Sequence, residues 1–206
     1  MLNFKKTLAG YSTSPLVKFL TVLRVSPNAL SWSGLIFSLI TAALIATAHL
    51  LAGGIMVLVS GGFDMLDGAL ARRTNRTTRF GGILDSTLDR ISEAMLLLGI
   101  LVLLLTTENP DLFWPLNREY AIFLLASVML STPMVSYLRA KAEAAGIDCQ
   151  LGIFTRPERV IVIALGLLFN QIVIALAIIA LLSLVTSGQR FILIWRKTRN
   201  EPPLTT

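Results

Sequence analysis

The most informative part of this 206-residue sequence is residues 64–89, which read DMLDGALARRTNRTTRFGGILDSTLD. Long apolar runs lie on both sides of this stretch, yet it contains four aspartates. Asp64 and Asp67 are three residues apart, and Asp85 and Asp89 are four residues apart, so each pair shares one face of a helix. The connection between the pairs is short. We therefore expect two antiparallel neighbouring helices whose four carboxylates lie at one membrane depth.

Four carboxylates in this setting indicate a cation site. Each acidic side chain at the centre of a membrane helix costs roughly 2.5–3.5 kcal/mol, and less near the interface. Grouped carboxylates also repel one another, and divalent cations between them would remove both costs. An all-oxygen set without His or Cys suits Mg²⁺ or Mn²⁺, which complete their shells with water and substrate phosphates. The alternative is that the aspartates cap helices or pair with nearby arginines, which explains one of them better than four.

The composition excludes a soluble domain, a disordered tail and a coiled coil. Hydrophobic residues make up 54% of the chain and charged residues 15%, with a mean hydropathy of +0.73. We expect an all-α integral membrane protein that forms a single domain over residues 1–206. A short amphipathic surface helix within residues 1–26 precedes six transmembrane helices in a core over 28–195, and a polar tail follows at 196–206. The six apolar runs are 28–49, 51–72, 80–107, 117–144, 157–171 and 172–195.

The charge distribution predicts the orientation in the cell membrane. With a cytoplasmic N-terminus, only Arg118 of the 18 Lys and Arg residues falls toward the outer side. Both termini and the aspartates are therefore expected on the cytoplasmic side. The formal charge of +6 then serves orientation and contact with membrane lipids, and we expect no nucleic-acid partner. The single cysteine, Cys149, and the single histidine, His49, exclude a disulfide framework and a multi-histidine metal site.

A second group of polar residues lies at the cytoplasmic ends of the last three predicted spans. Arginine binds phosphate with two parallel hydrogen bonds, so converging basic groups suit a phosphorylated alcohol. The alternative is that these residues only anchor lipid headgroups. Arg159 argues against it, because an idle charge at the start of an apolar helix is costly. The candidate acceptor-binding residues are Ser136, Arg139, Lys141, Arg156, Arg159 and Arg190.

The stretch 64–89 matches the pattern D-x2-D-G-x2-A-R-x8-G-x3-D-x3-D at all eight defined positions. This pattern resembles the signature of the CDP-alcohol phosphotransferase family, whose six-helix layout with an N-terminal surface helix is also similar to the one predicted here. The resemblance implies a transferase of phospholipid biosynthesis that moves a phospholipid group from a CDP-linked lipid to an alcohol and releases CMP. By resemblance, Asp64, Asp67 and Asp85 bind two metal ions, and Asp89 is the general base and also touches one metal.

The same resemblance implies the two substrates. Residues 26–31, SPNALS, resemble another nucleotide-side segment of the family. The implied contacts to the CDP-lipid are made by Asn28, Ser31, Gly68, Ala71, Arg72, Thr78 and Gly81. Residues 136–159 resemble the branch that uses inositol 1-phosphate as acceptor, with CDP-diacylglycerol or CDP-archaeol as donor.

Several alternatives stay open at this point. Glycerol 3-phosphate could replace inositol 1-phosphate in the same chemistry. An ion-coupled transporter would use the aspartates as its pathway, but it predicts acidic groups near mid-membrane rather than at helix ends. A membrane scaffold gives no reason for four aspartates. A homodimer is expected by resemblance to family members, and the roles of Glu93 and Cys149 are left open.

Overall fold

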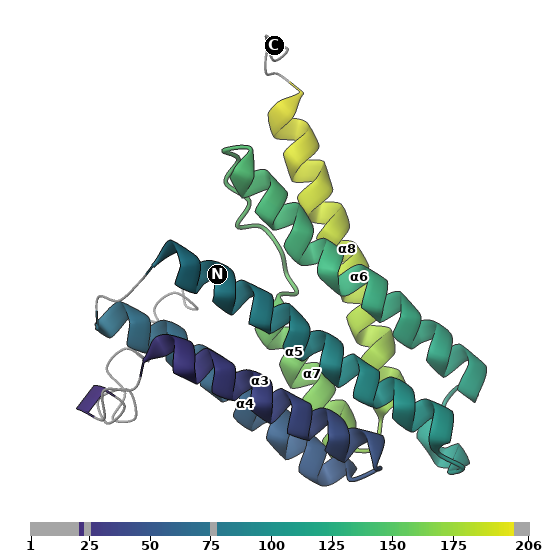
Figure 1. The fold of residues 1–206 in the computed structure, drawn as a ribbon. Helices are drawn as coiled ribbons and strands as arrows, with labels where there is room; N and C mark the ends of the chain where they lie inside the picture. Colours follow the sequence, from purple (N-terminus) through teal and green to yellow (C-terminus); the bar gives the residue numbers. More distant parts are fainter. Residues whose placement is uncertain (1–20, 23–25, 75–77, 200–206) are drawn as a thin grey trace. The chain divides into compact units, whose positions relative to one another are not determined.

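The computed structural model describes residues 21–22, 26–74 and 78–199, with no account of the side chains at 27, 65, 67, 68, 71 and 72. The predicted surface helix, the side chains of Asp67, Gly68, Ala71 and Arg72, and residues 200–206 of the tail lie outside this description. The described residues form helices and no strands, which confirms the all-α prediction (Figure 1). These are α3 (Pro27–Ala46), α4 (Leu50–Arg73), α5 (Arg79–Thr106), the 3₁₀ turn η1 (Pro110–Phe113), α6 (Arg118–Ala144), α7 (Arg156–Leu168) and α8 (Ile172–Thr198).

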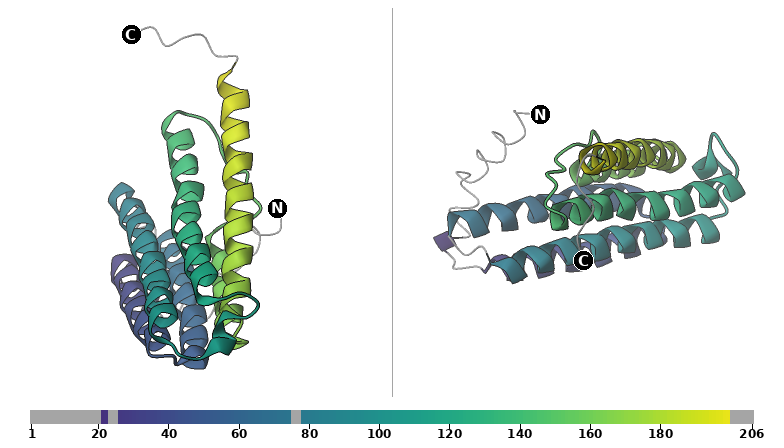
Figure 2. Two further views of the ribbon diagram at one scale, coloured as in Figure 1. Left: turned by 90° about the vertical axis from the view of Figure 1, so that its right-hand side faces the viewer. Right: turned by 90° about the horizontal axis from the view of Figure 1, so that it is seen from above.

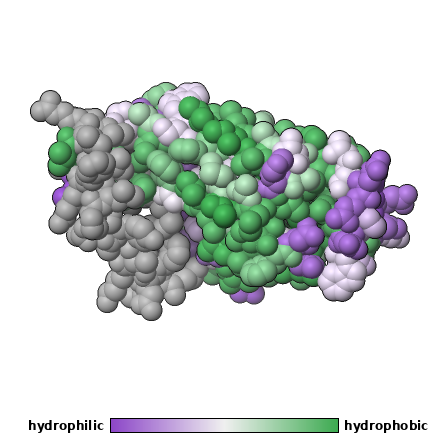
Figure 3. All heavy atoms as spheres, turned by 90° about the horizontal axis from the view of Figure 1, so that it is seen from below, coloured by the Kyte–Doolittle hydropathy of each residue, from purple (hydrophilic) through white to green (hydrophobic). Residues whose placement is uncertain are grey.

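The helices have the surface of a membrane protein. Three helices in the described part of the chain are long and apolar enough to cross a membrane, at Asn28–Ala46, Arg118–Ala144 and Ile172–Thr198, and Leu50–Asp64 is a shorter apolar helix. The prediction of six spans stays a prediction. Large apolar side chains are exposed along the helices, and they cover much of the face shown in Figure 3. Small hydroxyl side chains are buried instead, among them Ser38, Thr41, Ser60, Ser131, Thr132, Ser183 and Thr186.

Three helices end in the same backbone motif. A residue with positive φ follows the last turn of α3, α6 and α7, at Ala48, Gly146 and Asn170 respectively. In each case the next backbone N–H donates to a carbonyl five residues earlier, as from Gln171 to Gly166 at 2.7 Å. This is the Schellman motif, which satisfies carbonyls at the helix end. It explains why α3 and α7 stop three residues before the sequence-predicted ends.

The helices form two compact units, Met1–Leu103 and Leu104–Thr206, and each is described by itself. In the first unit, α3 and α4 pack side by side as an antiparallel pair (Figure 2). The hydroxyls of Ser38 and Ser60 share a hydrogen bond of 2.9 Å across this interface, and Ser60 also donates to the Gly34 carbonyl at 3.3 Å. Small polar residues of this kind let membrane helices approach closely and bond to each other.

In the second unit, α6 packs against α8, and the two helices run in the same direction (Figures 1 and 2). Buried residues on both helices recur at alternating spacings of three and four, which is the spacing of a coiled-coil seam. The α8 seam is apolar in its first half and polar in its second half. Its members are Ile172, Leu176, Ile179, Ser183, Thr186 and Arg190 on α8, and Ala121, Leu125, Val128, Thr132 and Val135 on α6.

Gly99 is a point of close approach between α5 and α3. A Cβ atom at Gly99 would lie 2.6 Å from the carbonyl oxygen of Ala42 and 2.9 Å from its Cα, and backbone atoms cannot move aside without separating the helices. We expect Gly99→Ala to lower the free energy of unfolding by about 1–3 kcal/mol, measured by thermal unfolding in detergent. Gly82→Ala on the same helix is the control, because a Cβ there meets nothing within 4 Å. Equal melting temperatures for the two variants would contradict this packing.

Candidate functional site

The acidic stretch lies in the first unit, where the α3–α4 interface positions Asp64. Asp64 follows Ser60 by one helical turn, so it lies on the face of α4 that packs against α3. Its carboxylate points at Gly34, because a Cβ atom built there would lie 2.7 Å from Asp64 Oδ1. The Asp64 side chain is only partly exposed. Beyond it, Leu66 and Leu70 are buried against Leu30 of α3, which holds the last turns of α4 in place.

Asp85 and Asp89 lie on one face of α5. Both side chains are partly buried, while Ser86, Thr87 and Arg90 between and beside them are exposed. The Arg90 guanidinium folds back onto the carbonyl of Ser86 on that exposed side. The two carboxylates thus face the protein rather than its surroundings. This placement agrees with a role for both of them in the interior of the unit.

Three of the predicted CDP-lipid contacts come together where α5 begins. The Thr78 hydroxyl accepts a 2.9 Å hydrogen bond from the Gly81 N–H and so caps the helix. A Cβ at Gly81 would lie 2.9 Å from Thr78 Oγ1 and 3.7 Å from Asn28 Oδ1, which brings the first turn of α3 to the first turn of α5. Ser31, one turn along α3 from Asn28, is 9% exposed. Small and polar groups therefore surround a helix N-terminus, whose partial positive charge favours phosphate.

The donor types fit a hard cation, although the described side chains alone do not form a metal cluster. No three of the His, Cys, Asp and Glu side chains that the structure describes are grouped so that they could hold an ion. Asp67 lies outside that set. Asp64 lies about two and a half turns before the end of α4. Asp85 lies roughly one and a half turns after the start of α5. The three aspartates whose side chains are described, Asp64, Asp85 and Asp89, are therefore not grouped around one ion position by themselves.

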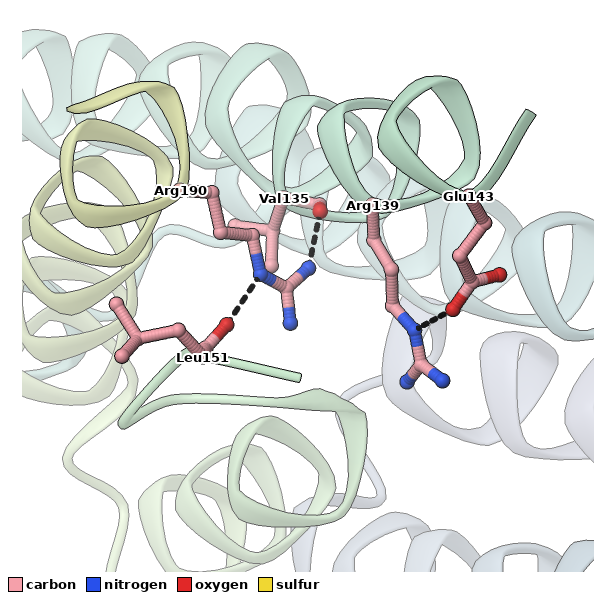
Figure 4. Close-up of polar contacts among 5 residues, drawn as sticks. All are labelled: Val135, Arg139, Glu143, Leu151 and Arg190. Carbon is pink, nitrogen blue, oxygen red and sulfur yellow. Dashed lines mark hydrogen bonds and ion pairs between the residues drawn. The ribbon is translucent and has the colours of Figure 1, made fainter. Parts of the chain in front are cut away.

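Arg190 is a firmly anchored basic residue of the second unit (Figure 4). It is 3% exposed, and its Nε donates a 2.8 Å hydrogen bond to the carbonyl of Leu151. Its Nη1 donates to the carbonyl of Val135 on α6. A Cβ at Gly152 would lie 2.9 Å from Arg190 Nη2, so only glycine allows the chain to pass this close to the guanidinium. Arg190 thus joins α6, α8 and the segment before α7.

Two further arginines lie within electrostatic reach of Arg190, namely Arg139 on α6 and Arg159 on α7. We call these three residues the arginine cluster. Arg159 is 2% exposed. Arg139 is about half exposed, and its Nε forms a 2.8 Å ion pair with Glu143 one turn later (Figure 4). Since the three residues come from three different helices, the fold concentrates positive charge at one place in this unit.

The remaining predicted acceptor residues differ in position. Arg156 is partly buried in the first turn of α7, which is fixed by a capping box between Thr155 and Glu158. Ser136 lies one turn before Arg139 and shares its face of α6. Lys141 does not share that face, because residues two apart differ by about 200° around a helix. Its exposed ammonium lies 5.8 Å from the ring centroid of Tyr137 instead.

The sequence interpretation did not identify three features of these sites. Gly34 opposite Asp64 gave no signal beyond being a glycine in an apolar helix. Glu143 is the acidic partner of Arg139, and its i,i+4 spacing could have indicated the pair. The carbonyls that bind Arg190 come from Val135 and Leu151, and no side-chain pattern encodes them.

Comparison with known proteins identifies similar sequences over most of the chain. A sequence profile of the CDP-alcohol phosphatidyltransferase family matches residues 24–197. An archaetidylinositol phosphate synthase of Pyrococcus horikoshii is 37% identical over 174 residues, which cover 84% of this chain and 85% of the relative. A phosphatidylinositol phosphate synthase of Mycobacteroides abscessus is 32% identical over 189 residues, which cover 86% of this chain and 81% of the relative.

Solved structures agree with these similarities. Mycobacterium tuberculosis phosphatidylinositol phosphate synthase in complex with manganese and citrate superposes with a TM-score of 0.77 at 28% identity, covering 89% of this chain and 88% of that one. The same enzyme with CDP-DAG bound gives a TM-score of 0.75 at 28% identity, covering 88% of this chain and 92% of that one.

The anchoring of Arg190 leads to a prediction about the segment before α7. Lysine keeps the charge but has no planar fork of donors, so Arg190→Lys loses at least one of the two carbonyl bonds. A hydrogen bond to a charged group is worth about 1.5–3 kcal/mol, so we expect Cys149 to react at least about tenfold faster with a maleimide. Cys149 is fully buried and is the only cysteine, which makes the labelling specific. Arg139→Lys is the control, and equal labelling rates in both variants would contradict the anchoring role.

Proposed function

Because the chain belongs to the CDP-alcohol phosphatidyltransferase family and is a transferase, we propose that its acceptor is inositol 1-phosphate. The chain transfers a phosphatidyl or archaetidyl group from CDP-diacylglycerol or CDP-archaeol to this acceptor, and CMP leaves. The observation that carries a phosphorylated acceptor is the arginine cluster, and the names of the relatives favour inositol 1-phosphate among such acceptors. An acceptor without a phosphate would leave the positive charge of these three guanidinium groups without an anionic ligand. Relatives named for inositol phosphate products support the same choice.

The CDP part of the donor binds in the first unit. Its diphosphate lies near the N-terminus of α5, where Asn28, Thr78 and Gly81 meet. Ser31 is the next polar side chain along α3. Gly68, Ala71 and Arg72 flank the nucleotide, as the family signature implies. The M. tuberculosis enzyme crystallised with CDP-DAG supports a CDP-lipid as donor.

Asp64, Asp67, Asp85 and Asp89 hold two divalent cations, Mg²⁺ or Mn²⁺. When bound, such ions neutralise the diphosphate and stabilise the charge that develops on the departing CMP. The aspartates provide hard oxygen ligands from two helices. The manganese complex of the M. tuberculosis enzyme supports a divalent ion in this role.

Asp89 acts as the general base. Its carboxylate takes the proton from the acceptor hydroxyl, and the hydroxyl oxygen attacks the lipid-linked phosphorus. A new phosphorus–oxygen bond forms to the acceptor while the bond to the CMP oxygen breaks, so no covalent enzyme intermediate is needed. Most of the acceleration comes from alignment of the reacting groups and from charge neutralisation.

In the second unit, the arginine cluster binds the phosphate of the acceptor. Arg190 contributes through Nη2, because its Nε and Nη1 already bond to backbone carbonyls. Arg139 contributes its two terminal nitrogens, which point away from Glu143 (Figure 4). Arg156 and Ser136 supply further donors. Lys141, which lies on another side of α6, attracts the anionic acceptor over a longer range.

The membrane arrangement completes the proposal. Both termini and the active site lie on the cytoplasmic side, as the sided distribution of Lys and Arg predicts. The protein is a homodimer in a lipid bilayer.

Glycerol 3-phosphate is the second candidate acceptor, because it would also satisfy the arginine cluster. Membership of a transferase family argues against an ion-coupled transporter.

An acceptor competition tests this proposal. Purified protein with CDP-diacylglycerol and Mg²⁺ is offered inositol 1-phosphate, inositol and glycerol 3-phosphate together, and the lipid products are identified by mass. We expect a lipid that carries inositol phosphate. A glycerol phosphate product would overturn the acceptor assignment but keep the aspartate chemistry. No product, even with CDP-archaeol as donor, would overturn the proposed transfer reaction.

The role of Asp89 is tested by Asp89→Asn. Asparagine keeps an oxygen ligand but cannot accept the proton, so we expect turnover to fall by at least about 10²-fold. Binding of Mn²⁺ and of the CDP-lipid should be largely retained, as measured by electron paramagnetic resonance and by calorimetry. Asp111→Asn in the exposed turn η1 is the control and should keep full activity. A turnover near the wild-type value in Asp89→Asn would refute the general-base assignment.

A further inference from the structure

We propose that Gly34 is a positioning residue for Asp64. The absence of a side chain at Gly34 leaves the space that the Asp64 carboxylate occupies, and so sets the direction in which that carboxylate points. This inference rests on the proposed function in one respect, because it takes Asp64 as a metal ligand. Gly34 lies on α3, outside residues 64–89, which contain all four aspartates.

The geometry is specific to this pair. A Cβ atom at Gly34 would lie 2.7 Å from Asp64 Oδ1 and 3.9 Å from its Cγ, and no other described atom comes within 4 Å once neighbouring backbone is set aside. Carbon and oxygen atoms that are not bonded to each other normally stay more than about 3 Å apart. An alanine at this position would therefore push against the carboxylate and against nothing else.

The helices cannot relieve this contact by sliding or separating. One turn further along the interface, Ser38 and Ser60 share a buried 2.9 Å hydrogen bond, and Ser60 also donates to the Gly34 carbonyl. The rings of Phe37 and Phe63 pack beside them with centroids 4.8 Å apart. The interface is therefore fixed on the side of Gly34 that faces away from the acidic stretch.

The carboxylate itself is the part that gives way. The obstructing atom is the end of a rotatable side chain rather than backbone, so rotation of the carboxylate relieves the contact. Alanine also favours a helix over glycine by roughly 0.5–1 kcal/mol. Gly34→Ala should consequently leave the fold as stable as before or more stable. A metal ligand tolerates only small errors in distance, about 0.2 Å, so the same rotation should weaken cation binding.

The experiment measures Mn²⁺ binding directly, by the electron paramagnetic resonance signal of free Mn²⁺, with full-length protein in detergent. We compare the wild type, Gly34→Ala, Asp64→Asn and Gly62→Ala. Gly62 is the matched control, because it also lies in a helix of the α3–α4 pair and a Cβ there meets nothing within 4 Å. Displacing a group that orients a ligand typically weakens metal affinity about 10- to 100-fold. We expect that loss in Gly34→Ala, a loss in Asp64→Asn, and no change in Gly62→Ala.

The outcomes separate this inference from the proposed function. Thermal unfolding of Gly34→Ala should occur at or above the temperature of Gly62→Ala. Wild-type Mn²⁺ affinity in Gly34→Ala, with a loss in Asp64→Asn, would overturn the positioning role and keep the metal site. Equal affinity in the wild type and Asp64→Asn would overturn the ligand assignment, and the positioning role with it. A Gly34→Ala protein that melts well below Gly62→Ala would also overturn the positioning role, because the obstruction would then lie in the backbone.

Discussion

Large apolar side chains cover the outward faces of these helices, so polar groups along most of their length have no water available as a partner. Hydrogen bonds within the helix, as from Thr41 to the Phe37 carbonyl, or to other parts of the protein are the partners that remain. The hydroxyl pair Ser38–Ser60 forms such a bond between α3 and α4, and the guanidinium of Arg190 forms such bonds by donating to carbonyls of Val135 and Leu151. The same groups that satisfy each other also fix the helices in register. Polar pairing therefore adds to apolar packing as a source of specificity in both units.

The two candidate sites carry opposite charges. The site in the first unit contains aspartates, which repel phosphate and need cations to bind it, whereas the site in the second unit contains arginines, which attract phosphate directly. In the proposed reaction, two anionic substrates are thus recognised by opposite means. A donor diphosphate bound through cations is already prepared for departure of CMP, because the ions neutralise the charge that develops on the leaving group. The phosphate of the acceptor does not react, so a fixed cationic binding site is sufficient for it.

The sequence predicted the helices well, because an apolar run of membrane length has few alternatives. Boundaries were missed by a few residues where the chain ends a helix with Ala48 or Asn170, since Ala48 is not a usual residue for a positive φ. The aspartates and the basic residues were selected as candidates because charge in an apolar helix is rare, and their roles stay predictions. Gly34 was not found, because a missing side chain matters only once its neighbour in space is known. Lys141 was grouped with Arg139 by proximity in the chain, although α6 places them on different sides.

Arg190 and Arg139 also differ in how firmly the structure holds their guanidinium groups. Arg190 is buried and has two donor nitrogens committed to carbonyls, so its remaining nitrogen is held in one direction before any ligand arrives. Arg139 is half exposed and shares its charge with Glu143. Binding through Arg190 costs little side-chain entropy, whereas binding through Arg139 competes with Glu143 and fixes a half-exposed side chain. A phosphate at the arginine cluster would therefore take its position from Arg190, and Arg139 would add attraction without setting the geometry.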